Sequence, residues 1–296
     1  MKKVQLLLLF MAIIFASQAC STTESETTAT EPEKEVAEEK VEISNKEKAV
    51  ALLESLETGD QTPISYINPA KYIQHNLGVA DGLEGFGMVM KNAPEGGFKA
   101  KVVRAFEDGD YVFTHTVYDF FGPKVGFDIF RFENGLIVEH WDNLIELAPK
   151  NPSGRSQTDG ETKSSQMEKT EDNKTIVGDF INTILIKGEF DKIGNYFDGD
   201  NYLQHNPAVA DGLSGLNKAL EEMAKNNVQM IYTTNHKVLG EGNFVLAVSE
   251  GTFGGQHTSY YDLFRMENGK IAEHWDVIET IAPEDKRMNN NGKFNF

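Results

Sequence analysis

The stretch DIFRFENGLIVEHWD at residues 128–142 returns later in the chain as DLFRMENGKIAEHWD at residues 262–276. In each copy Glu-Asn-Gly separates two runs of apolar and β-branched residues, which is a strong signal for a β-hairpin. A shorter pair of segments, YIQHN at 72–76 and YLQHN at 202–206, precedes the two hairpins. The hairpins lie 134 residues apart and the shorter blocks 130 residues apart. Two blocks in one order at nearly one offset indicate a duplicated domain and not a solenoid of short repeats.

The rest of each copy has the order of an α+β domain, with helices first and strands afterwards. Apolar residues recur at helical spacing over 49–56 and 174–186, and a second helix is expected to begin near Asp81 and near Asp211, both favoured N-cap residues. Four strands follow in each copy and end in the quoted hairpin. We therefore expect two cone-shaped domains, each a curved antiparallel sheet wrapped on helices around a cavity.

Composition limits the classes of partner. The chain has 296 residues, 40% of them hydrophobic, and a formal net charge of −18. Nucleic acid is not an expected partner, because phosphate binding needs clustered Lys and Arg. Peripheral binding to an anionic membrane is disfavoured for the same reason.

The amino terminus has the features of an export signal. Two lysines precede an apolar run at 4–15, which is too short to span a bilayer, and the only cysteine, Cys20, follows a short segment of small and polar residues. Residues 1–19 followed by a lone cysteine resemble the lipobox of bacterial lipoproteins, although Ser17 stands where that family usually has leucine. The resemblance implies lipidation of Cys20 and a cell-envelope protein held to a bacterial membrane by lipid, with the outer membrane favoured and the chain facing the periplasm or the cell surface.

Five further segments follow from composition and from the repeat. Residues 20–44 and 151–172 are rich in polar and acidic residues and poor in large apolar ones, so we expect a disordered tether and a disordered linker. The two domains then occupy 45–150 and 173–284. Residues 285–296 form a polar tail.

The repeated motifs resemble a known family. The Gln-His-Asn block before a helix and the Asp-Ile-Phe-Arg…Glu-His-Trp-Asp hairpin resemble SnoaL-like proteins of the nuclear transport factor 2-like superfamily, over residues 45–149 and 173–284. The resemblance implies a pocket for a small molecule and no cofactor. Some members are polyketide cyclases that use acid–base chemistry, whereas others only bind ligands, so the fold does not decide the function. Superfamily members often pair through their sheets, so the two domains could form an intramolecular pseudo-dimer.

The hairpin brings an aspartate near a histidine in either of two registers. With a three-residue loop Asp128 faces His140, and with a two-residue loop it faces Trp141. The first register is favoured because it groups polar side chains on one face, and the same argument joins Asp262 to His274.

An Asp–His pair in a half-apolar cavity has two interpretations. An adjacent carboxylate orients an imidazole and raises its basicity, so the pair could abstract a proton next to a carbonyl group. Alternatively, the pair is a structural hydrogen bond that closes the sheet. In the catalytic interpretation the four residues are Asp128, His140, Asp262 and His274.

Other side chains are candidates for binding in the pockets. They are Tyr72, His75, His115, Trp141, Asp142, Tyr202, His205, Trp275 and Asp276. The two Gln-His-Asn histidines either line the pocket or hold their loop, and the tryptophans are more typical of packing. His115 has no histidine counterpart in the second copy, so the two pockets need not bind the same molecule.

Metal binding is not expected, because the histidines are scattered and no dense ligand motif such as HExxH occurs. The chain has no Gly-rich phosphate loop and no nucleophile elbow. Three functions remain open: a cofactor-independent cyclase, isomerase or hydrolyase acting on a small carbonyl compound, an envelope module that only binds a ligand, and a protein-interaction module.

Overall fold

The computed structural model describes residues 43–296. The expected signal segment, Cys20 and nearly all of the tether lie outside these residues. Within the described range, no helix combines the length and the apolar character needed to cross a membrane.

The first half of the described chain contains two α-helices and one five-stranded sheet. The elements are α1 (Asn45–Thr58), a 3-10 turn (Thr62–Tyr66), β1 (Ile73–Gln74), α2 (Gly82–Lys91), β2 (Lys99–Asp108), β3 (Tyr111–Asp119), β4 (Pro123–Glu133) and β5 (Leu136–Glu146). The strand order is β1-β5-β4-β3-β2, with β1 parallel to β5 and the other neighbours antiparallel.

The second half repeats this arrangement. Its main elements are α3 (Thr170–Phe180), continued by a π-helical segment (Ile181–Ile186), β6 (Leu203–Gln204), α4 (Gly212–Lys225), β7 (Met230–Glu241), β8 (Phe244–Phe253), β9 (Gln256–Glu267) and β10 (Lys270–Thr280). Short 3-10 turns lie at Met167–Lys169, Phe190–Asn195 and Glu284–Lys286. The strand order β6-β10-β9-β8-β7 matches that of the first sheet. The predicted α+β class with two cone-shaped domains is confirmed.

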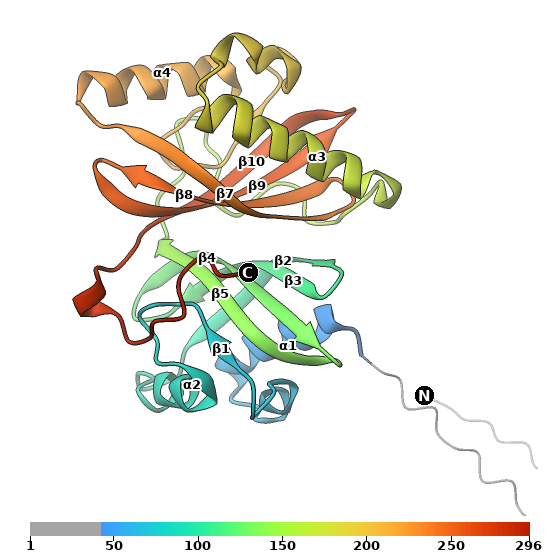
Figure 1. The fold of residues 1–296 in the computed structure, drawn as a ribbon, viewed down its shortest axis with the longest axis vertical. Coiled ribbons are helices and arrows are strands. Elements are labelled where there is room, and N and C mark those ends of the chain that lie inside the picture. Colours follow the sequence, from blue (N-terminus) through green and yellow to red (C-terminus); the bar gives the residue numbers. More distant parts are fainter. Residues whose placement is uncertain (1–42) are drawn as a thin grey trace, which may run out of the picture. The chain divides into compact units, whose positions relative to one another are not determined.

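Helix α1 shows how local sequence sets the bounds of an element. Ser44 and Glu47 form a capping box, in which each side chain satisfies the backbone N–H of the other residue. Gly59 ends the helix in the left-handed conformation, with φ 70°. Between these ends, Leu52 and Leu53 are buried in a cluster with residues of the sheet, against which α1 lies (Figure 1).

The hairpins differ from both predicted registers. Asn134 and Gly135 form a two-residue turn with φ of 51° and 73°, the left-handed pair that a type I′ turn requires. An irregularity between Arg131 and Phe132 then shifts the ladder. Asp128 consequently lies opposite Asp142, and His140 lies opposite Phe130. Both predicted registers are wrong because a β-bulge adds a residue that the turn alone does not reveal.

The second hairpin repeats the same departure. Asn268 and Gly269 form its turn, an irregularity falls between Ile271 and Glu273, and Asp262 lies opposite Asp276. Since both copies carry the bulge, it belongs to the repeated motif.

Each sheet has two buried faces. One face lies under the helices of its own half, α1 and α2 or α3 and α4 (Figure 1). The other face joins a buried cluster shared by both sheets. That cluster contains Phe106, Phe113, Phe127, Ile129 and Trp141 from the first sheet and Leu239, Phe244, Leu246, Val248, Tyr261, Leu263, Trp275 and Val277 from the second. The strands are therefore apolar on both faces, and the polar side chains among them need a specific explanation.

The segment after the first sheet, expected to be a disordered linker, makes specific contacts with the second half. Arg155 forms an ion pair with Asp211, with Nε 2.9 Å from both carboxylate oxygens. The Trp275 indole donates to the backbone carbonyl of Asp159 at 2.9 Å. These contacts hold the segment across the end of the second sheet.

The C-terminal tail makes the matching contacts with the first half. Asn291 Nδ2 donates to Asp81 at 2.7 Å, and the Trp141 indole donates to the carbonyl of Asn295 at 3.1 Å. The linker and the tail are therefore equivalent segments, each following one sheet and crossing to the other half.

Candidate functional site

An aspartate and a histidine form a hydrogen-bonded pair in each half. His274 Nε2 on β10 lies 3.0 Å from Asp262 Oδ1 on β9, and His140 Nε2 on β5 lies 3.2 Å from Asp128 Oδ1 on β4. All four residues are buried. The residues paired from the sequence are thus in contact, although as diagonal neighbours on one face of the sheet and not directly opposite each other.

A glutamine fixes the tautomer of each histidine. Gln204 Oε1 accepts the backbone N–H of Asn206 at 2.9 Å, so it is the oxygen that faces His274 Nδ1 at 3.1 Å. Nδ1 must therefore carry a hydrogen, and Nε2 faces a carboxylate oxygen of Asp262. The pair consequently holds one proton, either on the imidazole as an ion pair or on the carboxyl group. Gln74 plays the same part for the first pair.

A second carboxylate lies beside the pair in the second half. Both oxygens of Asp276 accept from Asn206 Nδ2, at 3.0 and 2.8 Å. Burial raises the pKa of Asp276, and the charge of Asp262 adds to this effect against the opposing charge of His274. Burial alone would lower the pKa of His274, but its hydrogen bond to Asp262 and the charge of Asp276 outweigh that effect and raise it. The site thus binds protons more tightly than free side chains do.

In the first half, the second carboxylate, Asp142, has a lysine as an additional partner. Asp142 accepts from Asn76 Nδ2 at 2.8 Å, and Lys293 Nζ from the C-terminal tail lies 3.8 Å from its other oxygen. The equivalent linker position carries Gln157, which has no charge. Within residues 43–296, Asp276 has no such ion pair with a lysine or arginine.

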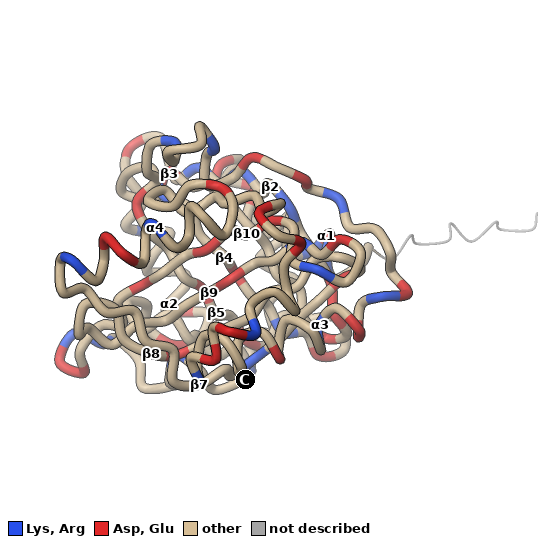
Figure 2. Tube along the Cα trace, turned by 90° about the horizontal axis from the view of Figure 1, so that it is seen from above, with Lys and Arg blue, Asp and Glu red and all other residues tan. Residues whose placement is uncertain are grey.

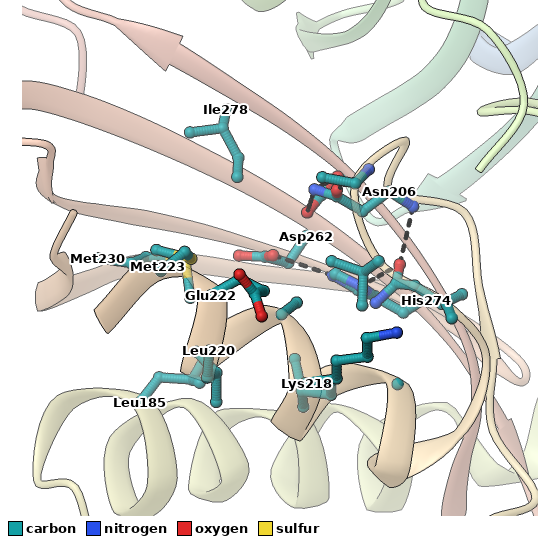
Figure 3. A pocket seen from close by; sticks show the side chains of 18 of the residues that line it. Leu185, Asn206, Lys218, Leu220, Glu222, Met223, Met230, Asp262, His274 and Ile278 are labelled. Atoms are coloured by element: carbon teal, nitrogen blue, oxygen red, sulfur yellow. Dashed lines mark hydrogen bonds and ion pairs between the residues drawn. The ribbon is translucent and has the colours of Figure 1, made fainter. Parts of the chain in front are cut away.

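Each Asp–His pair lines a cavity between its sheet and its helices. The cavity of the second half measures about 520 Å³ and that of the first about 110 Å³. Most of the second cavity's wall is apolar: Phe180, Leu185, Leu216, Leu220, Met223, Val228, Met230, Phe264 and Ile278. Figure 3 shows His274 and Asn206 at one end and Met223 and Met230 toward the other. Only the second cavity has the size typical of a site for a small organic ligand.

Four of the expected pocket residues lie on the other side of their sheets. Trp141 and Trp275 alternate with the cavity-facing residues along β5 and β10, so they point into the cluster between the sheets. His75 stacks on Trp141 and donates from Nδ1 to the carbonyl of Gly292, and His205 stacks on Trp275. Expecting these four side chains in the pockets was wrong, and the two histidines hold the tail and the linker instead.

His115 also lies outside the cavity, which corrects a further expectation. Arg104 Nη1 donates to its Nδ1 at 2.8 Å, and its ring stacks on Phe127. Burial lowers the pKa of His115 well below the usual value, and the charge of Arg104 lowers it further. His115 is therefore a neutral acceptor for a buried arginine.

Tyr72, Asp142, Tyr202 and Asp276 do line the cavities. The residues that sequence reasoning missed are Gln74, Asn76, Tyr118, Gln204, Asn206 and Tyr232. The glutamines and asparagines stand inside the repeated Gln-His-Asn block, so the repeat itself was a usable signal. The two tyrosines occupy different positions in the two copies, and no repeat could reveal them.

The Asp–His–Asp sets are compact enough to be considered for a metal ion. Among residues 43–296, one ligand atom from each of Asp128, His140 and Asp142 lies within 4.8 Å of the others, and the second set is equally close. In the structure, hydrogen bonds from histidine, asparagine and tyrosine side chains already engage these groups.

Figure 2 shows basic and acidic residues interspersed along the trace, in keeping with a chain of net charge −18.

Solved structures with similar folds each match about one domain of this chain. A protein of unknown function with a cystatin-like fold from Xanthomonas campestris is 19% identical, covers 36% of this chain and 89% of its own, and has a TM-score of 0.30. A SnoaL-like polyketide cyclase from Agrobacterium tumefaciens is 15% identical, with coverages of 36% and 91% and a TM-score of 0.28. An LEH-like epoxide hydrolase from M. tuberculosis is 19% identical, with coverages of 38% and 85% and a TM-score of 0.29.

Comparison with curated proteins gives no match. Comparison with protein families matches the sequence model of the SnoaL-like domain over residues 177–274. This range contains Asp262 and His274, and it covers the end of α3, all of α4 and most of the second sheet. Residues 177–274 of this chain are therefore a SnoaL-like domain.

Proposed function

We propose that the chain is a cell-envelope protein with two small-molecule pockets, and that the second pocket performs proton transfer on a small carbonyl compound without a cofactor. The observation that carries the proposal is the hydrogen-bonded pair of Asp262 and His274 at the polar end of a cavity of about 520 Å³. The reaction class is that of a cyclase, isomerase or hydrolyase.

The pair has the two capacities that such a reaction needs. Because the pair holds one proton, one partner accepts a proton from the carbon beside the carbonyl group while the other donates one to an oxygen or carbon of the substrate. The apolar walls bind the body of the substrate and keep water away, which strengthens the electrostatic interactions at the polar end.

The second proposal concerns the duplication. We infer that residues 45–150 form a second SnoaL-like domain and that the two domains pair through their sheets as an intramolecular pseudo-dimer. The shared cluster between the sheets and the reciprocal contacts of linker and tail support this inference. A pairing of this kind explains why strands in both halves are apolar on both faces.

A third proposal, based on the sequence alone, concerns the place of the protein in the cell. We propose that Cys20 carries lipid and anchors the chain to a bacterial membrane, with the domains facing the periplasm or the cell surface. The apolar run at 4–15 and the lone cysteine support this placement. Mass spectrometry of membrane-extracted protein tests it, since a chain that lacks an acylated Cys20 at its amino terminus would contradict it.

Solvent-deuterium exchange tests the catalytic proposal. The purified full chain is incubated in D2O with ketones of increasing length, and exchange at the carbon beside the carbonyl is followed by proton NMR. His274→Ala should lower the exchange rate by about 10²–10⁴ with little change in melting temperature, whereas the matched variant His140→Ala should lower it far less.

The opposite outcomes are equally informative. If no ketone exchanges but native mass spectrometry finds a small molecule that dissociates from the His274→Ala variant, the pocket only binds its ligand. If His274→Ala unfolds the protein, the pair is a structural hydrogen bond.

A further inference from the structure

A tyrosine hydroxyl donates to the aspartate of each pair. Tyr118 Oη donates to Asp128 Oδ2, and Tyr232 Oη lies 3.2 and 3.3 Å from the two carboxylate oxygens of Asp262. Both tyrosines are buried and both line their cavities. Each aspartate therefore has a histidine and a tyrosine as side-chain partners, and Asp128 also accepts from the Thr114 hydroxyl at 3.2 Å.

The two tyrosines come from different strands. Tyr118 lies on β3 opposite Ala100 of β2, whereas Tyr232 lies on β7 opposite Gly251 of β8. Because the two sheets have the same strand order, β7 corresponds to β2 and β8 corresponds to β3. Tyr118 lies four residues after Thr114, the residue opposite Asp128, and Gly251 lies four residues after Ala247, the residue opposite Asp262. At this cross-strand position each half has one tyrosine and one small residue, in opposite order.

Because the tyrosine and the small residue change places between the two halves, the role of the tyrosine hydroxyl can be distinguished from that of its ring. A side chain that only filled space would fill the same space in both halves, and any large apolar residue would serve. Here the rings approach from different strands, while both hydroxyls reach the carboxylate of the pair. What the two halves share is the O–H donated to the aspartate, so the hydroxyl and not the ring is the required feature.

We propose that Tyr118 and Tyr232 are positioning residues that keep Asp128 and Asp262 in the carboxylate form, so that the single proton of each pair resides on the histidine. This inference deepens the proposed function, because it assigns the histidine as the acid and the carboxylate as the base. The physical basis is that a hydrogen bond donated to a carboxylate stabilises its charged form. No proton is gained or lost, since only its position between Asp Oδ1 and His Nε2 is decided.

The surroundings of Asp262 agree with this assignment. Burial raises the pKa of Tyr232 well above its usual value, and the charge of Asp262 raises it further, so the tyrosine remains a donor. The other titratable groups around this site are Asp276 on β10, Tyr260 on β9 and Tyr202 ahead of β6, together with Lys218 and Glu222 of α4, which line the same cavity (Figure 3). Burial raises the pKa of the two tyrosines, so among the strand residues Asp276 is the carboxyl group that competes with Asp262 for the proton.

Nitrogen NMR of histidine-labelled full chain at pH 7 tests the proposal without a substrate. In the wild type both ring nitrogens of His274 should carry a hydrogen. In Tyr232→Phe the proton should move to Asp262, so that Nε2 of His274 takes the chemical shift of an unprotonated nitrogen. His140 should not change in this variant, and Tyr118→Phe should produce the reverse pattern.

A neighbouring tyrosine provides the matched control. Tyr260 stacks on Tyr232 at 4.1 Å, but its hydroxyl donates to the carbonyl of Thr252, so Tyr260→Phe should leave His274 doubly protonated. The proposal is overturned if Nε2 of His274 is unprotonated in the wild type, if Tyr232→Phe leaves it protonated, or if Tyr260→Phe has the same effect. If Tyr232→Phe does not fold, Tyr118→Phe decides the question in the other half. Absence of ketone exchange would contradict the proposed function alone, because the NMR signals do not depend on turnover.

Discussion

The two halves of this chain have the same fold, and each contains its own Asp–His–Asp set. Their cavities nevertheless differ nearly fivefold in volume, about 110 Å³ in the first half and 520 Å³ in the second. In the first half the ring of Tyr118 lines the cavity, and Lys293 lies beside Asp142. In the second half Gly251 stands at the position of Tyr118, and within residues 43–296 Asp276 forms no ion pair with a lysine. The polar set is thus retained while its surroundings have diverged.

The same set of side chains can therefore stabilise the structure in one half and take part in proton transfer in the other. A buried carboxylate next to an ammonium group is held as an ion pair, which favours structure. A buried carboxylate without a lysine partner, at the polar end of a larger cavity, has a raised pKa, as Asp276 does, and can take part in proton transfer. Four substitutions test which features distinguish the two halves: the ring of Tyr118, the charge of Lys293, the carboxylate of Asp276 and the surface ion pair of Lys71.

The largest effect is expected from Tyr118→Ala, which removes the ring from the first cavity. Truncating a buried aromatic side chain costs about 3–5 kcal/mol of unfolding free energy, and the first cavity should approach the second in size. Urea unfolding measures the loss, and binding of an apolar fluorescent dye measures the opening. A variant that is destabilised but still binds no dye would show that other walls keep the cavity narrow.

Lys293→Met should have the next largest effect. The ammonium group lies 2.6 Å from Glu279 and 3.8 Å from Asp142, so its removal leaves buried charge unpaired at a cost of about 3 kcal/mol. The control is Gln157→Met at the equivalent linker position, which loses one hydrogen bond to the backbone of Ala148. Equal losses of stability for the two variants in urea would mean that the charge of Lys293 does not matter.

Asp276→Asn should alter how stability depends on pH. The pKa values of Asp276 and His274 are both raised in the folded protein, above ordinary values of 3.8 and 6.5. The folded state therefore binds protons more tightly than the unfolded state, and their stabilisation is fully present at low pH and lost as pH rises through the raised values.

In Asp276→Asn the loss of stability with rising pH should be smaller than in the wild type. Melting temperatures from pH 4 to pH 8 should fall less for Asp276→Asn than for the wild type. Asp142→Asn, which deprives Lys293 of a partner, should instead destabilise the protein at pH 8. Parallel melting curves for wild type and Asp276→Asn would contradict the raised pKa values.

The smallest effect is expected from Lys71→Asn, which copies the residue at the equivalent position, Asn201. Lys71 pairs with Glu133 at 2.6 Å, but both side chains are well exposed to solvent. Exposed ion pairs contribute little, so the unfolding free energy in urea should change near the limit of detection. A large loss would show that surface charge also separates the two halves.

The repeat and the α+β class could be predicted from the sequence, and the favoured register also predicted the contact between aspartate and histidine. These features depend on local patterns: identical motifs at one offset, Asn-Gly turns and alternating side chains along a strand. The Asp–His contact survives because the observed register differs from the favoured one by two residues, which keeps the aspartate and the histidine on one face, whereas a shift of one residue would have separated them. Asp262 and His274 therefore meet even though a bulge places Asp262 opposite Asp276.

The side of the sheet on which each aromatic or histidine side chain lies could not be predicted without the three-dimensional structure. Both faces are buried, so burial could not distinguish a cavity wall from the cluster between the sheets, and His75, His115 and the tryptophans were misplaced. The tyrosine donors were also beyond the sequence, because Tyr118 and Tyr232 reach equivalent atoms from non-equivalent strands. A contact made across strands depends on where the backbones lie, and no spacing along a single chain encodes it.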